Sequence, residues 1–154
     1  MNLDPSAFVA DPALLDGLES KATPLACSEP RLLFRQGDDP SGLYILKSGR
    51  VTLSMASSAG AEVLSVEACA GSLLGLPGLI GDQPYTLTAM AHAGAQLSFI
   101  PREAFNGVIS TEPLLAFKIL QVLSAEVRSA RNAVLEQLAA PAARQHQLTH
   151  ARRT

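Results

Sequence analysis

The central part of the chain, from Arg31 to Pro101, consists of short apolar or alternating runs separated by glycine-containing turns. Such runs, spaced about 8–12 residues apart, are typical of the strands of an all-β sandwich or barrel and not of a βαβ fold. Lys47-Ser48-Gly49-Arg50 predicts a tight hairpin turn, because glycine readily adopts the positive φ that such a turn needs. The predicted strands are 31–35, 42–47, 50–55, 62–67, 73–75, 85–91 and 96–101.

Helical patterns flank these strands on both sides. Asp11 followed by Pro12 predicts a helix over residues 11–20, because aspartate caps a helix and proline fits its first turn. Arg102 begins a pattern that predicts a short helix ending before Glu112. The sequence therefore predicts a mainly β fold with flanking helices.

A long helix is predicted over residues 113–140, and Pro141 is expected to end it, because proline lacks the amide hydrogen and clashes with the preceding turn. Residues 141–154 are then a basic, flexible tail, for which a non-specific anion contact is the alternative role. Apolar residues along the helix follow the 3.5-residue spacing of a coiled-coil seam and predict a homodimer: Leu120, Leu123, Val127, Ala130 and Val134. An amphipathic helix packed on its own domain would give the same pattern.

Length and composition limit the class of protein. The 154 residues (16.2 kDa) fit one domain, and 47% hydrophobic with 17% charged residues favour a compact fold over disorder. The net charge of −2 gives no general reason to expect nucleic-acid binding. No apolar run reaches the ~18 residues of a membrane span. Acidic residues and prolines stand where a secretory signal would be basic and then apolar, so we expect a cytoplasmic protein without membrane contact.

Few residues have the spacing that catalysis or metal binding needs. Cys27 and Cys69 match no metal or iron–sulfur pattern. His92 is interpreted as a surface histidine, and His146 and His150 lie in the predicted tail. The sequence has no Walker loop, dinucleotide fingerprint or nucleophile motif. It therefore predicts no enzyme, no catalytic residues, no metal and no cofactor.

Four segments carry a family resemblance: LFRQGD at 33–38, GLYILKSGRV at 42–51, GSLLG at 71–75 and REAF at 102–105. Together with the order of strands and helices, they resemble the cyclic-nucleotide-binding domain, most of all the sensor half of CRP/FNR-type bacterial regulators. The resemblance implies a double-stranded β-helix, or jelly-roll-like β-roll, within a sensor domain over residues 1–140. Too few residues follow the long helix for the family's helix-turn-helix, so this chain is not expected to read DNA bases.

Two positions depart from the ligand-binding pattern of that family, which resembles GELAL…PRSATV. Leu76 stands where the family's glutamate accepts a ribose hydroxyl, and Tyr85 stands where its arginine pairs with the cyclic phosphate. Leucine cannot accept a hydrogen bond and a phenol cannot neutralise a phosphate, so ordinary cyclic AMP or cyclic GMP binding is not expected. The pocket that the resemblance implies consists of Gly75, Leu76, Pro77, Gly78, Leu79, Tyr85, Thr86 and Thr88.

Two functional hypotheses follow. The first is a sensor whose roll holds an uncharged or mostly apolar effector, with the Tyr85 phenol as a polar handle. Its cavity would be lined by Leu73, Leu74, Leu76, Leu79, Ile80, Tyr85, Leu87 and Met90. The second is a barrel filled by its own side chains, which would leave a dimerisation or partner-binding module. The sequence leaves both open.

Overall fold

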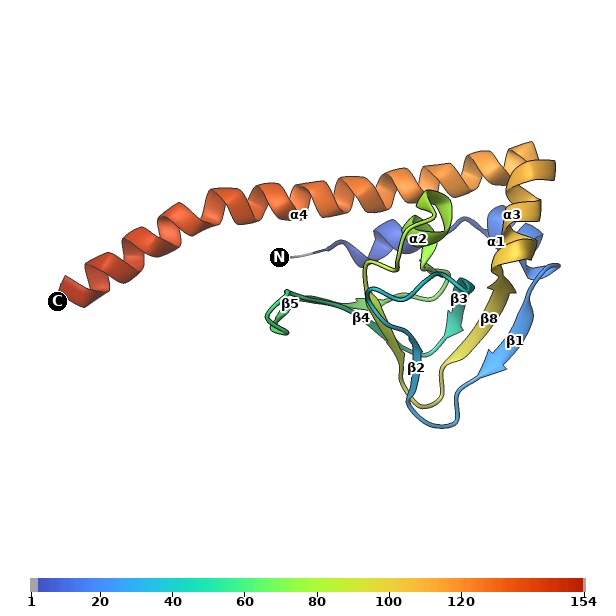
Figure 1. Ribbon diagram of the computed structural model, residues 1–154, viewed down its shortest axis with the longest axis horizontal. Helices are drawn as coiled ribbons and strands as arrows, with labels where there is room; N and C mark the ends of the chain where they lie inside the picture. The colour runs from blue at the N-terminus through green and yellow to red at the C-terminus, as the bar shows by residue number, and fades with distance from the viewer. Residues whose placement is uncertain (1–2, 154) are drawn as a thin grey trace.

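The structure is a computed structural model that describes the backbone of residues 3–153 and the side chains of residues 3–136 (Figure 1). A short 3-10 helix, η1 (Pro5–Phe8), and α1 (Pro12–Glu19) precede the strands. The strands and the helix between them are β1 (Thr23–Ala26), β2 (Arg31–Phe34), β3 (Gly42–Ser48), β4 (Val51–Ala56), β5 (Glu62–Ala68), β6 (Leu73–Leu74), α2 (Leu76–Gly81), β7 (Thr88–Ala91) and β8 (Gln96–Pro101). Two helices follow, α3 (Arg102–Thr111) and α4 (Pro113–Arg153).

The strands form two four-stranded antiparallel sheets, with the orders β1-β8-β3-β6 and β2-β7-β4-β5. Strands that are neighbours in a sheet are often distant in sequence, as in a jelly roll. The hairpin between β3 and β4 turns at Gly49, whose φ is +88°. A Cβ at this position would lie 2.7 Å from the Ala95 Cα, which is closer than van der Waals contact allows. The predicted β-roll with flanking helices is therefore confirmed.

Two details of the strand prediction were wrong. Residues 23–26 form β1, a strand that was not predicted; it pairs with β8 at the edge of its sheet, where Pro24 is tolerated. The strand predicted from residue 85 begins at Thr88. Tyr85 instead exchanges backbone hydrogen bonds with the β2–β3 loop, donating to Asp38 and accepting from Gly37.

The helix starts follow the predicted signals. The Asp11 carboxylate accepts a hydrogen bond from the Leu14 amide at 2.7 Å, which caps α1. α4 begins at Pro113 as predicted but continues through Pro141 to Arg153, so its predicted end at residue 140 was wrong. The alanines on both sides of Pro141 are the strongest helix formers and offset the hydrogen bond that proline cannot make. A boundary between a domain and a tail stays a prediction.

The core consists of two clusters. The roll cluster fills the space between the two sheets and includes Phe34, Tyr44, Leu46, Leu53, Leu74, Tyr85 and Leu97. The helix-side cluster lies between one sheet and the helices and includes Leu14, Leu18, Leu43, Leu76, Ile100, Phe105 and Ile119.

α4 lies along the roll and is held there by the N-terminal segment, while its C-terminal part extends past the sheets (Figure 1). The Asp4 amide donates to the Ser129 hydroxyl at 2.8 Å. Lys118 donates to the Asp11 carboxylate, also at 2.8 Å, and this bond lowers the pKa of Asp11 below its usual value. The first half of α4 is thus fixed against the domain from which it emerges.

Candidate ligand-binding site

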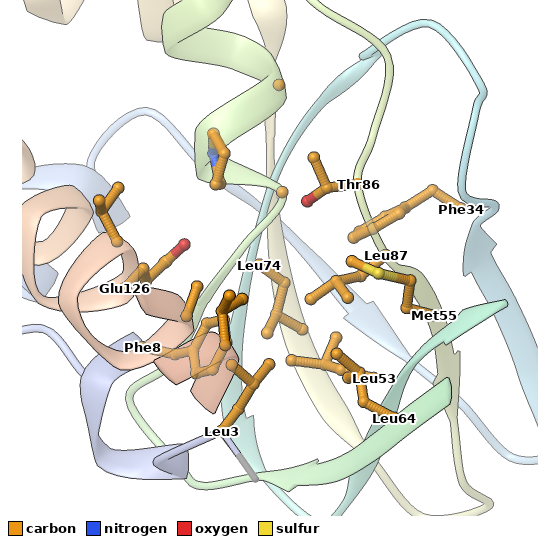
Figure 2. A pocket seen from close by; sticks show the side chains of 16 residues that line it. Leu3, Phe8, Phe34, Leu53, Met55, Leu64, Leu74, Thr86, Leu87 and Glu126 are labelled. Carbon is orange, nitrogen blue, oxygen red and sulfur yellow. The ribbon is translucent and has the colours of Figure 1, made fainter. Parts of the chain in front are cut away.

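A cavity of about 360 Å³, partly open to solvent, lies between β4, β5, α2 and α4 (Figure 2). This volume is at the lower end of the range for small-molecule sites. The cavity is lined by Leu3, Phe8, Phe34, Leu53, Met55, Leu64, Leu74, Gly75, Pro77, Gly78, Thr86, Leu87, Glu126, Val127, Ala130 and Val134. A roll completely filled by its own side chains, one of the two alternatives, is therefore not what the structure has.

The cavity wall is almost entirely apolar. Among the lining residues only Thr86 and Glu126 carry a polar oxygen in the side chain, and none of them is lysine, arginine or histidine. The segment 71–88 around α2, here called the cassette, contains no lysine or arginine, and the next one along the sequence, Arg102, is committed elsewhere. It pairs with Asp82 and donates to the Pro40 carbonyl. A ligand in this cavity would therefore meet hydrocarbon on most sides and no positive charge from these lining residues.

Glu126 is the exception in this wall. Its side chain reaches from α4 toward the cavity, on the side opposite Phe34 and Met55 (Figure 2). The residue is 7% exposed, and its Oε1 is a buried oxygen without a hydrogen-bond partner among the described residues. Burial raises the pKa of this carboxyl to about 8, because desolvation disfavours the charged form.

Glu126 is absent from the predicted pocket, although the sequence contains a signal for it. Among the side chains of α4 that the structure describes, the buried ones are Ile119, Val122, Glu126 and Ala133, a spacing of three, four and seven residues that follows one helix face. Of these four buried residues, Glu126 is the one with an ionisable side chain. Lys, Glu, Arg and Asp are almost never fully buried without a partner, which makes a glutamate at such a position informative.

The predicted pocket residues divide into two groups. Gly75, Pro77, Gly78 and Thr86 line the cavity. Leu76 and Leu79 do not, because they point into the helix-side cluster. Thr88 lies outside the lining as well, and its hydroxyl accepts a hydrogen bond from the Gln36 amide at 2.9 Å. Of the other apolar residues expected around a cavity, Leu74 and Leu87 are part of the wall, whereas Leu73, Ile80 and Met90 are not.

Tyr85 is a structural residue and not a polar handle for the cavity. Its ring stacks on Phe34 with a centroid distance of 4.0 Å. Its hydroxyl accepts hydrogen bonds from the amides of Ser41 (3.0 Å) and Gly42 (3.2 Å) and donates to the Gly42 carbonyl at 2.8 Å. Both the ring and the hydroxyl are therefore engaged inside the protein.

The predicted seam residues also divide. Leu120, Val127, Ala130 and Val134 are exposed on α4, and Phe117 extends the exposed apolar stripe by one turn. Leu123 instead packs on the helix-side cluster of its own domain. Val127, Ala130 and Val134 additionally line the cavity. The same turns of α4 thus carry both an apolar surface and part of the cavity wall.

The remaining candidates from the sequence are a metal site, the three histidines and a membrane-spanning helix. In the described part of the chain, no three His, Cys, Asp or Glu side chains lie close enough together to hold a metal ion. His92 contacts the Thr52 hydroxyl at 2.7 Å on the sheet surface, and the side chains of His146 and His150 lie outside the described residues. Within residues 3–153, no one helix has both the length and the apolar composition to cross a membrane; α3 and α4 meet that test only jointly, with a bend of 114° between them.

The residues matched by a family model now identify the class of protein. Residues 28–112 match the cyclic nucleotide-binding domain, and the chain belongs to this family. Its fold is that of the sensor domains of CRP/FNR-type regulators.

Individual relatives agree with this assignment. The Thermus thermophilus catabolite activator protein has a TM-score of 0.71 and 25% identity, over 88% of this chain and 63% of that one. The sensor domain of the transcriptional regulator DNR from Pseudomonas aeruginosa shares the fold, with a TM-score of 0.60, 23% identity and coverage of 79% and 82%. A neuropathy target esterase from Drosophila persimilis is 29% identical over 94 residues, which is 61% of this chain but spans only 7% of that protein.

Proposed function

We propose that this domain is a non-catalytic regulatory sensor whose effector is an uncharged or mostly apolar small molecule bound in the roll cavity. The observation that carries the proposal is the wall of the cavity. Apolar side chains from both sheets and from α4 surround it, and the polar side-chain groups that face it are the Thr86 hydroxyl and the Glu126 carboxyl. Burial of an apolar ligand in such a space is favourable at roughly 25 cal/mol per Å² of surface removed from water.

The same wall argues against a cyclic nucleotide as the effector. A cyclic phosphate carries a negative charge, which needs a cation or a set of donors when it is buried. The residues that line the cavity supply no cation, and Glu126 would add repulsion whenever it is ionised. Tyr85, at the position of the family's arginine, directs its hydroxyl to Ser41 and Gly42 and away from any ligand.

Ligand binding would be transmitted to the rest of the molecule through two helices that form part of the cavity wall. Pro77 and Gly78 belong to α2, and Val127, Ala130 and Val134 belong to α4. An effector that fits between these helices with different affinity in two arrangements would shift their relative populations. Because the three α4 residues also form the exposed stripe, the proposed output is a change at a homodimer interface. In this proposal the domain is cytoplasmic and contacts no DNA bases itself.

The test is a thermal-shift and calorimetric titration with 1-octanol, cyclic AMP and cyclic GMP. A ligand at 100 times its Kd adds about 2.7 kcal/mol, which raises the Tm of a domain of this size by a few degrees. We expect a shift with 1-octanol and none with the cyclic nucleotides. Ala130→Trp, which fills the cavity from α4, should abolish the shift, and Asn132→Trp on the same helix outside the wall should not. Cyclic nucleotide binding in the unaltered protein would refute the proposal.

A second candidate function is a dimerisation or partner-binding module without an effector. The observation that favours it is the exposed apolar stripe of α4, in which Phe117 is 59% and Leu120 48% exposed. Leu120→Glu would place two like charges together at a symmetric seam and should shift the chain to monomers in sedimentation. The neighbouring exposed Gln121→Glu is the matched control. If Leu120→Glu leaves a dimer intact, the seam lies elsewhere.

A further inference from the structure

The Glu126 carboxyl lacks a partner on the side where the cavity begins. Its Oε1 is buried and unbonded among the described residues, and its side chain lines the cavity. The remaining wall is hydrocarbon apart from the Thr86 hydroxyl. A buried carboxyl without a donor is costly for the fold, whether or not it is ionised. A donor that enters the cavity beside this side chain would remove that cost once the carboxyl turns toward it.

Packing alone gives no reason for a carboxyl at this position. Ile119, Val122 and Ala133 occupy the same helix face and are buried apolar residues, so a leucine would continue the pattern. Other charged side chains on these turns lie elsewhere: Arg128 and Glu136 line a separate surface depression together with Asp4. The lining residues therefore leave Glu126 as the ionisable group that faces the cavity.

We infer that the effector is an apolar molecule with a single hydrogen-bond-donating head group, an amine or a hydroxyl, and that Glu126 is the residue that receives this group. The inference rests on the proposed function and deepens it by naming the class of ligand. A hydroxyl donates to Oε1 of the carboxyl in either protonation state. An ammonium group forms a charge-assisted hydrogen bond with the carboxylate, and the pair is neutral overall. A carboxylate or phosphate head has no hydrogen to donate to the unbonded oxygen; it can only accept from the protonated carboxyl, and it is repelled once Glu126 ionises. The inference therefore ranks this class below the two donor heads.

The experiment compares three probes with the same eight-carbon chain and different heads: octylamine, 1-octanol and octanoate. Their affinities are measured by calorimetry on the full chain and on Glu126→Leu, Glu126→Gln and the control Glu136→Gln, an exposed glutamate on the same helix. We expect the amine and the alcohol to bind more tightly than octanoate to the unaltered protein. Glu126→Leu should weaken both about tenfold to a hundredfold, as for loss of a hydrogen bond to a charged or buried group, and octanoate should bind this variant no less tightly. Glu136→Gln should change nothing.

The variants also separate the two donor heads. Glu126→Gln keeps an accepting carbonyl without a charge, so it should weaken octylamine much more than 1-octanol. If all three probes bind the unaltered protein equally and Glu126→Leu changes none of them, the inference is overturned while the apolar sensor stands. If none of the three binds, the proposed function fails and the inference fails with it. Thermal melting of Glu126→Leu, which should be at least as stable as the unaltered protein, shows that any loss of binding is not a loss of fold.

Discussion

The two core clusters of this domain are built from similar residues and packed very differently. The helix-side cluster is the more tightly packed of the two: Leu14, Leu18, Leu43, Leu76 and Phe105 are each no more than 1% exposed, and the depression beside Leu79 and Phe105 holds only about 170 Å³. The roll cluster contains more aromatic residues and borders a cavity of about 360 Å³ whose wall includes Glu126. Interiors are normally packed as densely as organic crystals, so the open space beside this cluster is room that a ligand can occupy.

The helix-side cluster stabilises the domain, whereas the cavity beside the roll cluster is where a ligand can bind. α1, α3 and the first half of α4 bury their apolar faces in the helix-side cluster and fix the helices on one sheet. The next turns of α4 face the hollow instead, through Glu126, Val127 and Ala130. One helix thus passes from a packed environment to an open one within two turns, which is where an effector would have the most influence on it.

The largest expected effect comes from truncating one leucine of the helix-side cluster and one leucine of the cavity wall. Leu76→Ala removes a side chain that is 0% exposed and tightly packed, and should lower the free energy of unfolding by about 3–5 kcal/mol. Leu64→Ala, in the cavity wall, should cost closer to ~2 kcal/mol because one side of Leu64 already faces empty space. Chemical denaturation measures both. Equal losses would mean that the hollow is closed in solution and that the comparison between the clusters fails.

Much of this architecture was predictable because it depends on local patterns. The turn at Gly49, the cap at Asp11 and the start of α4 at Pro113 each follow from the conformational preference of one or two residues. The edge strand β1 was not predicted because its pairing with β8 joins residues 70 to 76 positions apart, and because Pro24 is unusual in a strand. The end of α4 was predicted wrongly at residue 140, because the helix continues through Pro141, where alanines on both sides favour a helix.

The candidate site was predictable only in part. The glycines and prolines of the cassette lead to its location, and Gly75, Pro77, Gly78 and Thr86 do line the cavity. Whether Leu76 and Leu79 face the cavity or the helices depends on the orientation of α2, a helix of six residues with no sequence periodicity to fix it. Glu126 lies on α4, 50 residues after Leu76, and its burial depends on which face of α4 packs against the domain.

The second prediction concerns the pH dependence of stability. The pKa of Glu126 is about 8 in the folded protein and near 4.5 when exposed, so its contribution is fully present below pH 4.5 and is lost as the pH rises through 8. Each pKa unit is worth 1.36 kcal/mol, which gives a loss on the order of 3 kcal/mol after allowance for relaxation around the charge. The unfolding free energy of Glu126→Gln minus that of the unaltered protein should therefore grow between pH 5.5 and pH 9. Titration of all other groups cancels in this difference, and a flat difference would show that Glu126 reaches water.

The smallest effect tests whether Tyr85 supports the roll or the ligand. Tyr85→Phe leaves the amides of Ser41 and Gly42 without their acceptor and should lower the free energy of unfolding by about 1–2 kcal/mol. Tyr44→Phe is the matched control, because the hydrogen bond of the Tyr44 hydroxyl to the Leu33 carbonyl is long, at 3.4 Å. The affinity of 1-octanol should be the same in Tyr85→Phe and in the unaltered protein, since the phenol does not line the cavity. A variant that keeps its stability and loses octanol binding would make Tyr85 the ligand's polar contact, and would move the sensing group from α4 to the cassette.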